Sequence, residues 1–382
     1  MVSRESGGRR GTAPSINKNP QVKKMGVQEK LKELEDELAR TQKNKATEYH
    51  IGIIKSKIAQ LRREVMAPKK HGASAGGFDV KKSGDATVAI IGLPSVGKST
   101  LLNKLTNAES KTAAYAFTTL KCIPGVMEYN KTKIQLLDLP GIIEGAKDGK
   151  GRGREVIAVA RSSDLVLILI EATNPRQLKI IETELHGFGI RPNGKRPDVS
   201  IGKQARGGVT INSTVPLTKI TEKEIHAAMS GYSMFNANVV IRNDITIDEF
   251  IDVLEGNRVY IPTLIALSKC DLVRELPKLP YPFIPISAEK NIGIEELKKA
   301  TYEKLNLINI YTKKRGEDAD LTEPMVVRAG IDVGSVCEKL HRDLKKEFRY
   351  ALVWGKSVKH QPQRVGLAHI MADGDIIQII KR

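Results

Sequence analysis

A phosphate-binding loop directly after an apolar run is the feature that most constrains this chain. Residues 92–100 read Gly-Leu-Pro-Ser-Val-Gly-Lys-Ser-Thr, which matches G-x-x-x-x-G-K-[ST], and they follow the apolar run 88–91. A strand that enters a glycine-rich turn and then a helix points backbone N–H groups and the positive end of the helix dipole at one spot. The sequence therefore predicts a polyphosphate site in which Lys98 reaches the β and γ phosphates and Ser99 holds Mg²⁺. For this motif alone, a tight turn with a surface lysine is the alternative.

Two aspartate motifs and a short dipeptide follow in the order that a nucleotide site requires. The segment 138–141, Asp-Leu-Pro-Gly, has the D-x-x-G form, in which the Asp supports Mg²⁺ and the Gly N–H meets the γ phosphate. The segment 268–271, Ser-Lys-Cys-Asp, ends in a carboxylate that can accept two N–H donors of guanine. Adenine offers no such pair, so Asp271 favours GTP over ATP. Ser287-Ala288 offers a backbone N–H for guanine O6, although the dipeptide alone is uninformative.

These motifs, together with a pair of threonines at 118–119, resemble the five signature elements of translation-factor-type GTPases. Further segments narrow the resemblance to the Obg-related class and, within it, to the developmentally regulated GTP-binding proteins. The Obg-like segments are 115–120 and 137–154, and those similar to the narrower family are 39–47, 255–262 and 350–355. On these markers the chain is identified as a member of that family over residues 25–382.

The resemblance implies a set of site residues, with GTP as substrate and GDP as product. As catalytic residues it implies Lys98, Thr119 and Gly141. Around the nucleotide it implies Gly92, Pro94, Ser95, Val96, Gly97, Lys98, Ser99, Thr100, Phe117, Thr118, Thr119, Asp138, Gly141, Ser268, Lys269, Asp271, Ser287 and Ala288. As ligands of Mg²⁺ it implies Ser99, Thr119 and, through water, Asp138, with Thr118 the less favoured switch threonine.

Three positions depart from patterns common among related GTPases. Ile142 stands where Ras-like enzymes carry a water-positioning Gln, so we expect slow intrinsic hydrolysis unless a partner or a monovalent cation assists. K⁺ is a candidate cofactor because some related GTPases bind it through an Asn of the phosphate loop, but Ser95 occupies the comparable position and does not support it. Ser268 replaces the usual Asn of the guanine motif. We expect guanine specificity to survive that change and affinity to fall.

The periodicity of apolar residues predicts an α/β fold with several appended parts. Alternating strand and helix signals predict a parallel sheet covered on both faces. The long separation between Asp138 and Asp271 indicates an inserted small α+β subdomain. The expected parts are a disordered basic tail at 1–24, a helical hairpin at 25–67, a linker at 68–85, a P-loop GTPase domain at 86–309 with the insert at about 185–244, and a C-terminal domain at 310–382.

Within these parts the sequence leaves some readings open. The hairpin is either an autonomous basic docking element or a scaffold packed on its neighbour. In the insert we expect strands at 209–213 and 238–241 and a helix at 221–234, and the glycine-rich basic segment 187–208 is expected to be a mobile loop. Short strands around one helix at the C-terminus resemble the TGS module, a β-grasp domain. That domain contacts RNA or a partner, or serves as a rigid spacer.

The net charge of +18 is concentrated outside the predicted catalytic core. Residues 1–84 hold 19 Lys and Arg against 9 Asp and Glu, whereas 85–185 and 246–309 together are neutral. Basic appendages on a neutral core favour attachment to a polyanion such as nucleic acid, and solubility by charge is the alternative. The longest apolar run, 165–170, is far shorter than the roughly 20 residues of a membrane helix, so no membrane association is expected. Three separated cysteines disfavour a disulfide framework and a zinc site, and the cytoplasm fits this pattern.

Two functions follow from these features. The first is a monomeric GTPase switch that docks on the ribosome or on RNA and acts in translation, without binding a membrane. The resemblance also implies a stabilising regulatory protein partner of the kind that the family uses. The second is a nucleotide-stabilised scaffold or adaptor whose turnover is incidental. Asp271 disfavours an ATPase.

Overall fold

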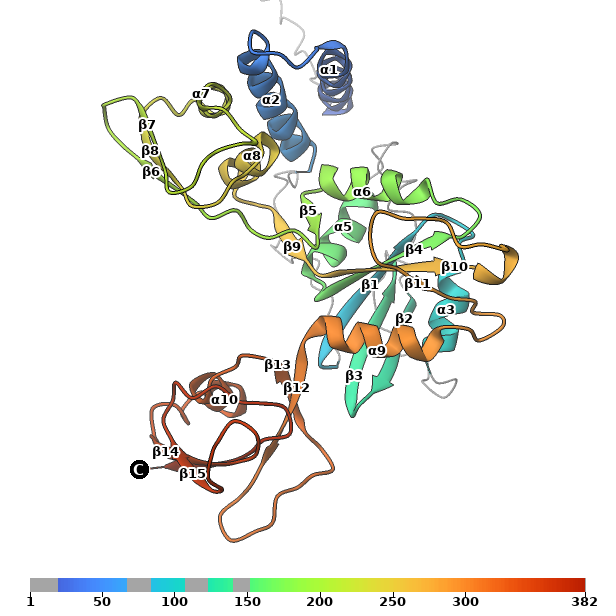
Figure 1. Cartoon of the computed structure of the whole chain (residues 1–382), viewed down its shortest axis with the longest axis vertical. Coiled ribbons are helices and arrows are strands. Elements are labelled where there is room, and N and C mark those ends of the chain that lie inside the picture. The colour runs from blue at the N-terminus through green and yellow to red at the C-terminus, as the bar shows by residue number, and fades with distance from the viewer. Residues whose placement is uncertain (1–19, 67–83, 107–122, 140–151, 382) are drawn as a thin grey trace, which may run out of the picture. The chain divides into compact units, whose positions relative to one another are not determined.

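The structure, a computed structural model, describes residues 20–66, 84–106, 123–139 and 152–381. Only the backbone is described at 20–25, 66, 123–124 and 152–155. The chain divides into two compact units (Figure 1). One comprises residues 1–71 and 197–257, and the other comprises residues 72–196 and 258–382.

A six-stranded, mostly parallel sheet forms the centre of the larger unit. Its strands lie in the order β11-β10-β4-β1-β3-β2, and only β2 runs antiparallel to its neighbour. The apolar run of β4 pairs with β1 on one side and with β10 on the other, and its residues 165–170 are almost fully buried. The bounds are β1 Ala86–Gly92, β2 Ile123–Tyr129, β3 Thr132–Asp138, β4 Leu165–Glu171, β10 Thr263–Ser268 and β11 Ile284–Pro285.

Helices cover both faces of this sheet, as the alternation of strand and helix signals predicts. Helices α3 (Lys98–Leu105) and α9 (Ile294–Leu305) share one apolar core with the sheet. Helices α5 (Arg152–Ser162) and α6 (Gln177–Gly187) share the core on the opposite face. Because helices cover both faces, ligands can reach the sheet only at the ends of its strands. In folds of this kind they bind at the carboxyl ends.

The C-terminal part of the larger unit is a β-grasp domain, as predicted. Its sheet has the order β13-β12-β16-β14-β15, with β12 and β16 parallel and helix α10 packed on one face. Arg328 Nη2 lies 2.6 Å from Asp164 Oδ1, and Lys131 Nζ donates to the carbonyl of Leu321 at 2.7 Å, so side chains tie this domain to the central one. The bounds are β12 Leu307–Thr312, β13 Met325–Arg328, α10 Val333–Leu340, β14 Phe348–Trp354, β15 Gln363–Val365 and β16 Ile376–Lys381.

The smaller unit joins an N-terminal helical hairpin to a segment that interrupts the central domain. A three-stranded sheet, β6-β8-β7, packs against α7 and α8, and Ala59 of α2 belongs to the same buried core. A two-stranded parallel ribbon, β5 (Ile190–Pro192) with β9 (Val259–Ile261), pairs the chain just before and just after this segment. The bounds are α1 Pro20–Arg40, α2 Glu48–Met66, β6 Val199–Lys203, β7 Val209–Ser213, α7 Glu222–Gly231, β8 Ala237–Ile241 and α8 Ile247–Glu255.

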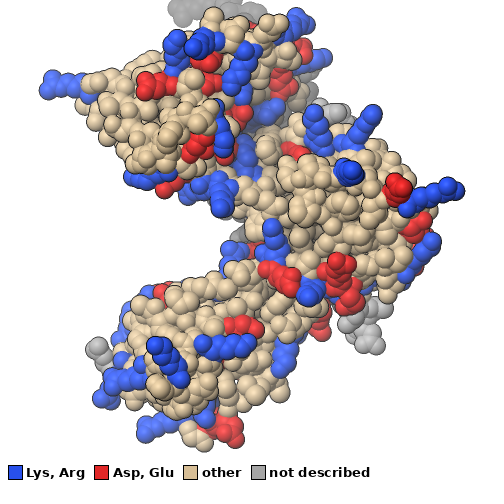
Figure 2. Space-filling view, viewed as in Figure 1, with Lys and Arg blue, Asp and Glu red and all other residues tan. Residues whose placement is uncertain are grey.

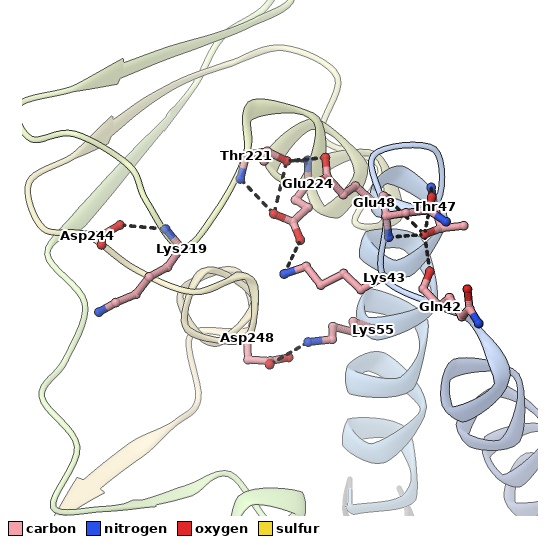
Figure 3. A network of polar contacts seen from close by, with 11 residues as sticks. Gln42, Lys43, Thr47, Glu48, Lys55, Lys219, Thr221, Glu224, Asp244 and Asp248 are labelled. Atoms are coloured by element: carbon pink, nitrogen blue, oxygen red, sulfur yellow. Dashed lines mark hydrogen bonds and ion pairs between the residues drawn. The ribbon is translucent and has the colours of Figure 1, made fainter.

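Close helix packing and ion pairs fix the hairpin on the inserted segment. A Cβ built at Gly52 of α2 meets the Cβ of Ala227 at 2.7 Å, and one built at Gly231 meets the Cβ of Ser56 at 2.7 Å, so α2 and α7 approach through small residues. Figure 3 shows the polar contacts beside this seam, in which Lys55 pairs with Asp248 at 2.7 Å. The contacts support the scaffold reading of the hairpin, in which it packs on its neighbour.

Glu224 is the buried member of that polar network. It completes a capping box with Thr221 at the start of α7, and its Oε1 lies 3.7 Å from Lys43 Nζ (Figure 3). The side chain is only 2% exposed, so its charge is compensated by the helix N-terminus and by the lysine rather than by water.

Four segments differ from the sequence-based expectations. The inserted segment spans 197–257 rather than about 185–244, because α8 packs in its core, and the C-terminal sheet begins with β12 at Leu307 rather than at 310. The segment 187–208 is not a loop throughout, because it contains β5 and β6, and Ile190 is fully buried. Its strands are short, with three and five residues, and they pair with β9 and β8, which lie far along the chain. Helix α1 begins at Pro20, inside the expected tail 1–24, since proline fits the first turn of a helix. Among the described helices, none combines the length and the apolar composition needed to cross a bilayer.

The glycine seam generates a stability prediction. Replacing Gly52 by Ala adds a methyl group where the neighbouring Cβ is only 2.7 Å away, so we expect a loss of about 1–3 kcal/mol in the opening free energy of α2 and α7. Hydrogen exchange of the α7 amides measures it. The matched control is Gly26→Ala in α1, where nothing lies within 4 Å and the helix propensity of Ala gives a neutral or stabilising change. Equal effects of the two substitutions would contradict the proposed seam.

Candidate functional site

The phosphate-binding loop joins the carboxyl end of β1 to the first turn of α3. Ser95 and Gly97 have φ angles of 63° and 94°, the left-handed conformation that curls a loop tightly. Gly97 is the N-cap of α3 and supplies no side-chain cap. A Cβ at Gly92 meets the carbonyl oxygen of Leu169 at 2.6 Å, so the first glycine is required where the end of β1 runs beside β4. The loop and the helix terminus therefore form a concave group of donors suited to phosphate oxygens.

Lys98 lies over this loop rather than in solvent. Its Nζ donates to the carbonyl oxygens of Gly92 and Leu93, each at 3.0 Å. Both acceptors belong to the loop itself, so the ammonium group is held beside the surface that the sequence predicts for the β and γ phosphates. An ammonium is a mobile point charge on a flexible stem and can exchange these carbonyls for phosphate oxygens.

Ser99 and Asp138 meet although they are far apart in the sequence. Strand β3 pairs in parallel with β1, with Ile90 opposite Asp138, and this register brings the carboxylate to the start of α3. The Ser99 hydroxyl donates to Asp138 Oδ2 at 3.0 Å. The second oxygen, Asp138 Oδ1, is buried without a hydrogen-bond partner among the described residues.

An unpartnered buried carboxylate oxygen is costly unless a ligand satisfies it. Here it stands beside a hydroxyl at the mouth of a phosphate loop, and hydroxyl and carboxylate oxygens are the ligand type that Mg²⁺ prefers. The residues present therefore fit a magnesium ion held with phosphate, as the sequence predicts.

A cavity of about 400 Å³ continues from the loop toward the ends of β10 and β11. Its lining combines the phosphate loop with both segments predicted to bind guanine. The lining residues are Ser95, Val96, Gly97, Thr100, Leu101, Leu169, Ser268, Lys269, Asp271, Leu272, Ile286, Ser287, Ala288 and Glu289. A phosphate cradle at one end and a carboxylate at the other match the two ends of a nucleotide.

Asp271 is oriented by groups that also keep it ionised. A hydrogen bond from Ser287 holds the pKa of this carboxyl below its usual range, and the nearby charge of Lys290 acts in the same direction. Lys290 Nζ lies 3.5 Å from Asp271 Oδ2. The carboxylate is therefore available as an acceptor at neutral pH, which guanine recognition requires.

Ser287 and Ala288 are not equivalent at this end of the cavity. The backbone N–H of Ser287 donates to the carbonyl of Ile292 at 3.0 Å, and its hydroxyl accepts the N–H of Lys290 at 3.2 Å. Ser287 is thus committed to holding its own turn and Asp271. Among the two backbone N–H groups that the sequence offers to guanine O6, this leaves that of Ala288.

Ser268 connects the guanine motif to the phosphate loop. Its hydroxyl lies 2.9 Å from the carbonyl of Val96 and 3.0 Å from that of Ile170, and the residue is 6% exposed. A buried hydroxyl shared between two carbonyls ties β10 to the loop and to β4. The serine therefore retains the structural half of the role expected of the usual Asn.

Two cavity-side contacts had no counterpart in the sequence motifs. Lys269, with a φ of 56°, pairs through Nζ with Glu171 Oε1 at 2.7 Å, and Lys290 reaches Asp271. A charged residue directly after the apolar run of β4 was the available signal for Glu171. The sequence could not show that its strand lies beside β10.

Other predicted site residues lie outside the described residues. These are Phe117, Thr118, Thr119 and Gly141, together with Ile142. The structure brings the remaining predicted residues to the carboxyl edge of the parallel sheet, which is where the order of motifs places them.

Family models match three regions of the chain. Residues 87–202 match the family described as "50S ribosome-binding GTPase", 206–307 match the "C-terminal region of MMR_HSR1 domain", and 308–381 match the "TGS domain". The crystal structure of a GTP-binding protein from Pyrococcus horikoshii has a TM-score of 0.42 and 16% identity, and the match covers 78% of this chain and 100% of that one.

Full-length relatives are much more similar in sequence. The "Developmentally-regulated GTP-binding protein 1 homolog" of Dictyostelium discoideum is 49% identical over 371 residues, which covers 94% of this chain and 100% of the relative. The human "Developmentally-regulated GTP-binding protein 2" is 49% identical over 365 residues, with 94% and 100% covered. The chain belongs to the developmentally regulated GTP-binding proteins, GTPases that carry a C-terminal TGS domain.

Proposed function

We propose that this GTPase is a slow nucleotide switch that associates with the ribosome or with RNA and acts in translation. The observation that carries the proposal is one cavity lined by both the phosphate loop and a guanine-type carboxylate. Ser99 and Asp138, a hydroxyl–carboxylate pair suited to Mg²⁺, meet at the first turn of the helix that this loop opens. A nucleotide that spans this cavity contacts residues at the ends of β1, β10 and β11, so its loss or hydrolysis changes the contacts of several strand ends.

The triphosphate end is assigned to residues of the loop and its neighbours. Lys98 neutralises charge on the β and γ oxygens, and the backbone N–H groups of the loop hold the phosphates in place. Ser99, Thr119 and, through water, Asp138 hold Mg²⁺, which supplies charge neutralisation at the phosphates when bound. The N–H of Gly141 meets the γ phosphate.

The base end is assigned to Asp271 and Ala288. The Asp271 carboxylate accepts two guanine N–H donors, and the Ala288 N–H donates to guanine O6. Ser287 positions the carboxylate, and Ser268 keeps the guanine motif joined to the loop. Because adenine presents an acceptor at N1, it leaves the carboxylate unsatisfied.

Base specificity is tested by Asp271→Asn. The amide no longer accepts two donors but can donate to the O2 of xanthine, so we expect GTP affinity to fall by roughly a hundredfold or more and preference to move to xanthine nucleotides. Titration calorimetry with GTP, ATP and xanthosine triphosphate measures it. Glu289→Gln, which removes another carboxylate at the same cavity, is the matched control and keeps the GTP preference. Equal affinity of the unaltered protein for GTP and ATP would reject the assignment.

Turnover is tested on the isolated protein. With Ile142 in place of the usual Gln, we expect hydrolysis on the order of 10⁻⁴ to 10⁻² s⁻¹ and its loss in Lys98→Ala. Single-turnover assays in sodium and in potassium buffers measure the rate and test whether K⁺ assists despite Ser95. Per-second turnover in sodium buffer would show that another residue already positions the water.

Association with the ribosome or RNA is supported by the family description and by charge. The matched family is described as ribosome-binding, and the basic surplus lies outside the neutral catalytic core. Lys and Arg side chains stand over the visible surface of both units (Figure 2). In this proposal the protein is a cytoplasmic monomer that also uses a stabilising regulatory protein partner, and GTP hydrolysis tunes its docking.

Docking is tested by co-sedimentation of the full chain with ribosomes across a salt series. Each neutralised phosphate releases counterions, so binding should fall steeply as salt rises. Changing Arg4, Arg9, Arg10 and Lys18 to Gln should flatten that slope without altering GTP hydrolysis. Ribosome binding that does not depend on salt would contradict the proposal, and acceleration of GTP hydrolysis by ribosomes would strengthen it.

A further inference from the structure

One face of the β-grasp sheet carries aromatic rings in register. Core residues such as Ala351 and Val353 point to α10, whereas Tyr350, Leu352 and Trp354 alternate with them and are half-buried on the opposite face. The register extends this face across the sheet, because Trp354 pairs with Ile376 and Ile376 pairs with Tyr311. Three rings, Tyr311, Tyr350 and Trp354, therefore lie on one sheet surface.

A cationic side chain lies over each of these rings. Arg364 Cζ is 4.1 Å from the centroid of Tyr350, Lys313 Nζ is 5.2 Å from that of Trp354, and Lys131 Nζ is 5.6 Å from that of Tyr311. Arg364 is exposed, and it pairs across the sheet with Leu352, which places it on the ring face. Because this side chain is exposed, its guanidinium offers a second surface for stacking beside Tyr350.

Acidic residues are missing from this part of the sheet. In β14, β15 and β16, all of which the structure describes, the residues that share the face with Tyr350 and Trp354 are apolar or amide-bearing apart from Arg364, and none is Asp or Glu. The domain from 310 to 382 has more basic than acidic residues, and Lys and Arg outnumber Asp and Glu among the charged side chains of this domain that are visible in Figure 2. The charge of the surface is complementary to a polyanion.

We propose that this aromatic–basic face, defined by Tyr350, Trp354, Arg364 and Lys313, binds single-stranded RNA. The inference rests on the proposed association with RNA and names the surface that makes it. Unpaired bases stack on aromatic rings and on arginine planes, while basic side chains follow the backbone phosphates. Tyr350 and Trp354 lie four residues apart on one strand, about 13 Å, so two bases that are not adjacent in an extended single strand can reach both rings. A duplex keeps its bases stacked inside and cannot use the rings.

The chain carries its own probe for this contact, because Trp354 is its only tryptophan. Titration of the full-length protein with a short oligo(U) is expected to quench Trp354 fluorescence along a saturable curve, since a stacked base contacts the indole. The same length of duplex RNA should leave the emission unchanged. Unchanged emission at oligo(U) concentrations that saturate binding would place the RNA elsewhere and overturn the proposal.

Substitutions separate stacking from charge. Tyr350→Ala and Arg364→Ala should each weaken binding of labelled oligo(U) by roughly five- to a hundredfold in fluorescence anisotropy. Arg364→Lys keeps the charge but loses the plane, so we expect it to restore only part of the affinity. Lys339→Ala, on the exposed side of α10, removes one charge from the other face of the domain and is the matched control. Equal affinities of Arg364→Ala and Lys339→Ala would overturn the assignment of this face.

Two readouts keep this test distinct from that of the proposed function. Basal GTP hydrolysis and circular dichroism should be unchanged in the Arg364 variants, because Arg364 is exposed and does not line the nucleotide cavity. If ribosomes still bind in a salt-dependent way while none of the variants alters oligo(U) binding, the proposed function stands and this face is excluded. If the unaltered protein binds ribosomes without salt dependence, the proposed function itself fails.

Discussion

Parallel pairing of β1 with β3 and β4 is the constraint on which the nucleotide site depends. The register of β1 with β3 sets Asp138 beside the start of α3, and the register of β4 with β10 sets Ser268 beside the phosphate loop. In a parallel sheet all carboxyl ends share one edge, so motifs from several strands converge there. Side-chain hydrogen bonds, such as that of Ser99 with Asp138 and that of Ser268 with the carbonyl of Val96, then join these motifs. The buried run of β4, closed in by helices on both faces, holds this arrangement rigid.

The buried hydroxyl of Ser268 shows how the site tolerates an unusual residue. An Asn in that position is expected to reach the loop with its amide, and the shorter serine makes its contacts with the carbonyls of Val96 and Ile170 instead. The serine therefore still holds the guanine motif in place. Asp271 is positioned by other residues, through its hydrogen bond with Ser287 and the turn that Ser287 forms with Lys290. Structural support and base recognition are divided between different residues here.

A two-stranded ribbon lies where the inserted segment leaves and rejoins the central domain. The pairing of β5 with β9 closes the chain just before and after the segment, so the central sheet is continuous in its hydrogen bonding despite the interruption. The segment then shares a core with the N-terminal hairpin, through the small-residue contact of Gly52 with Ala227 and the buried Glu224. Two pieces that are separated by more than a hundred residues along the chain, according to its numbering, thus form one unit.

The sequence by itself determined the chemistry of the site and most of the core elements. The phosphate loop, Asp138 and Asp271 are local motifs at the ends of apolar runs, and the strand expected at 209–213 matches β7 in both bounds, since such patterns depend only on near neighbours. Tertiary structure alone decided the rest. Strands β5 and β6 form by pairing with partners that are distant in the chain. The hairpin packs on the inserted segment because small residues let α2 and α7 approach each other. Tyr311, Tyr350 and Trp354 share one face because of the order and register of their strands. Pairing between residues far apart in the chain leaves no periodic signature in either partner, which is why these features could not be predicted from the sequence.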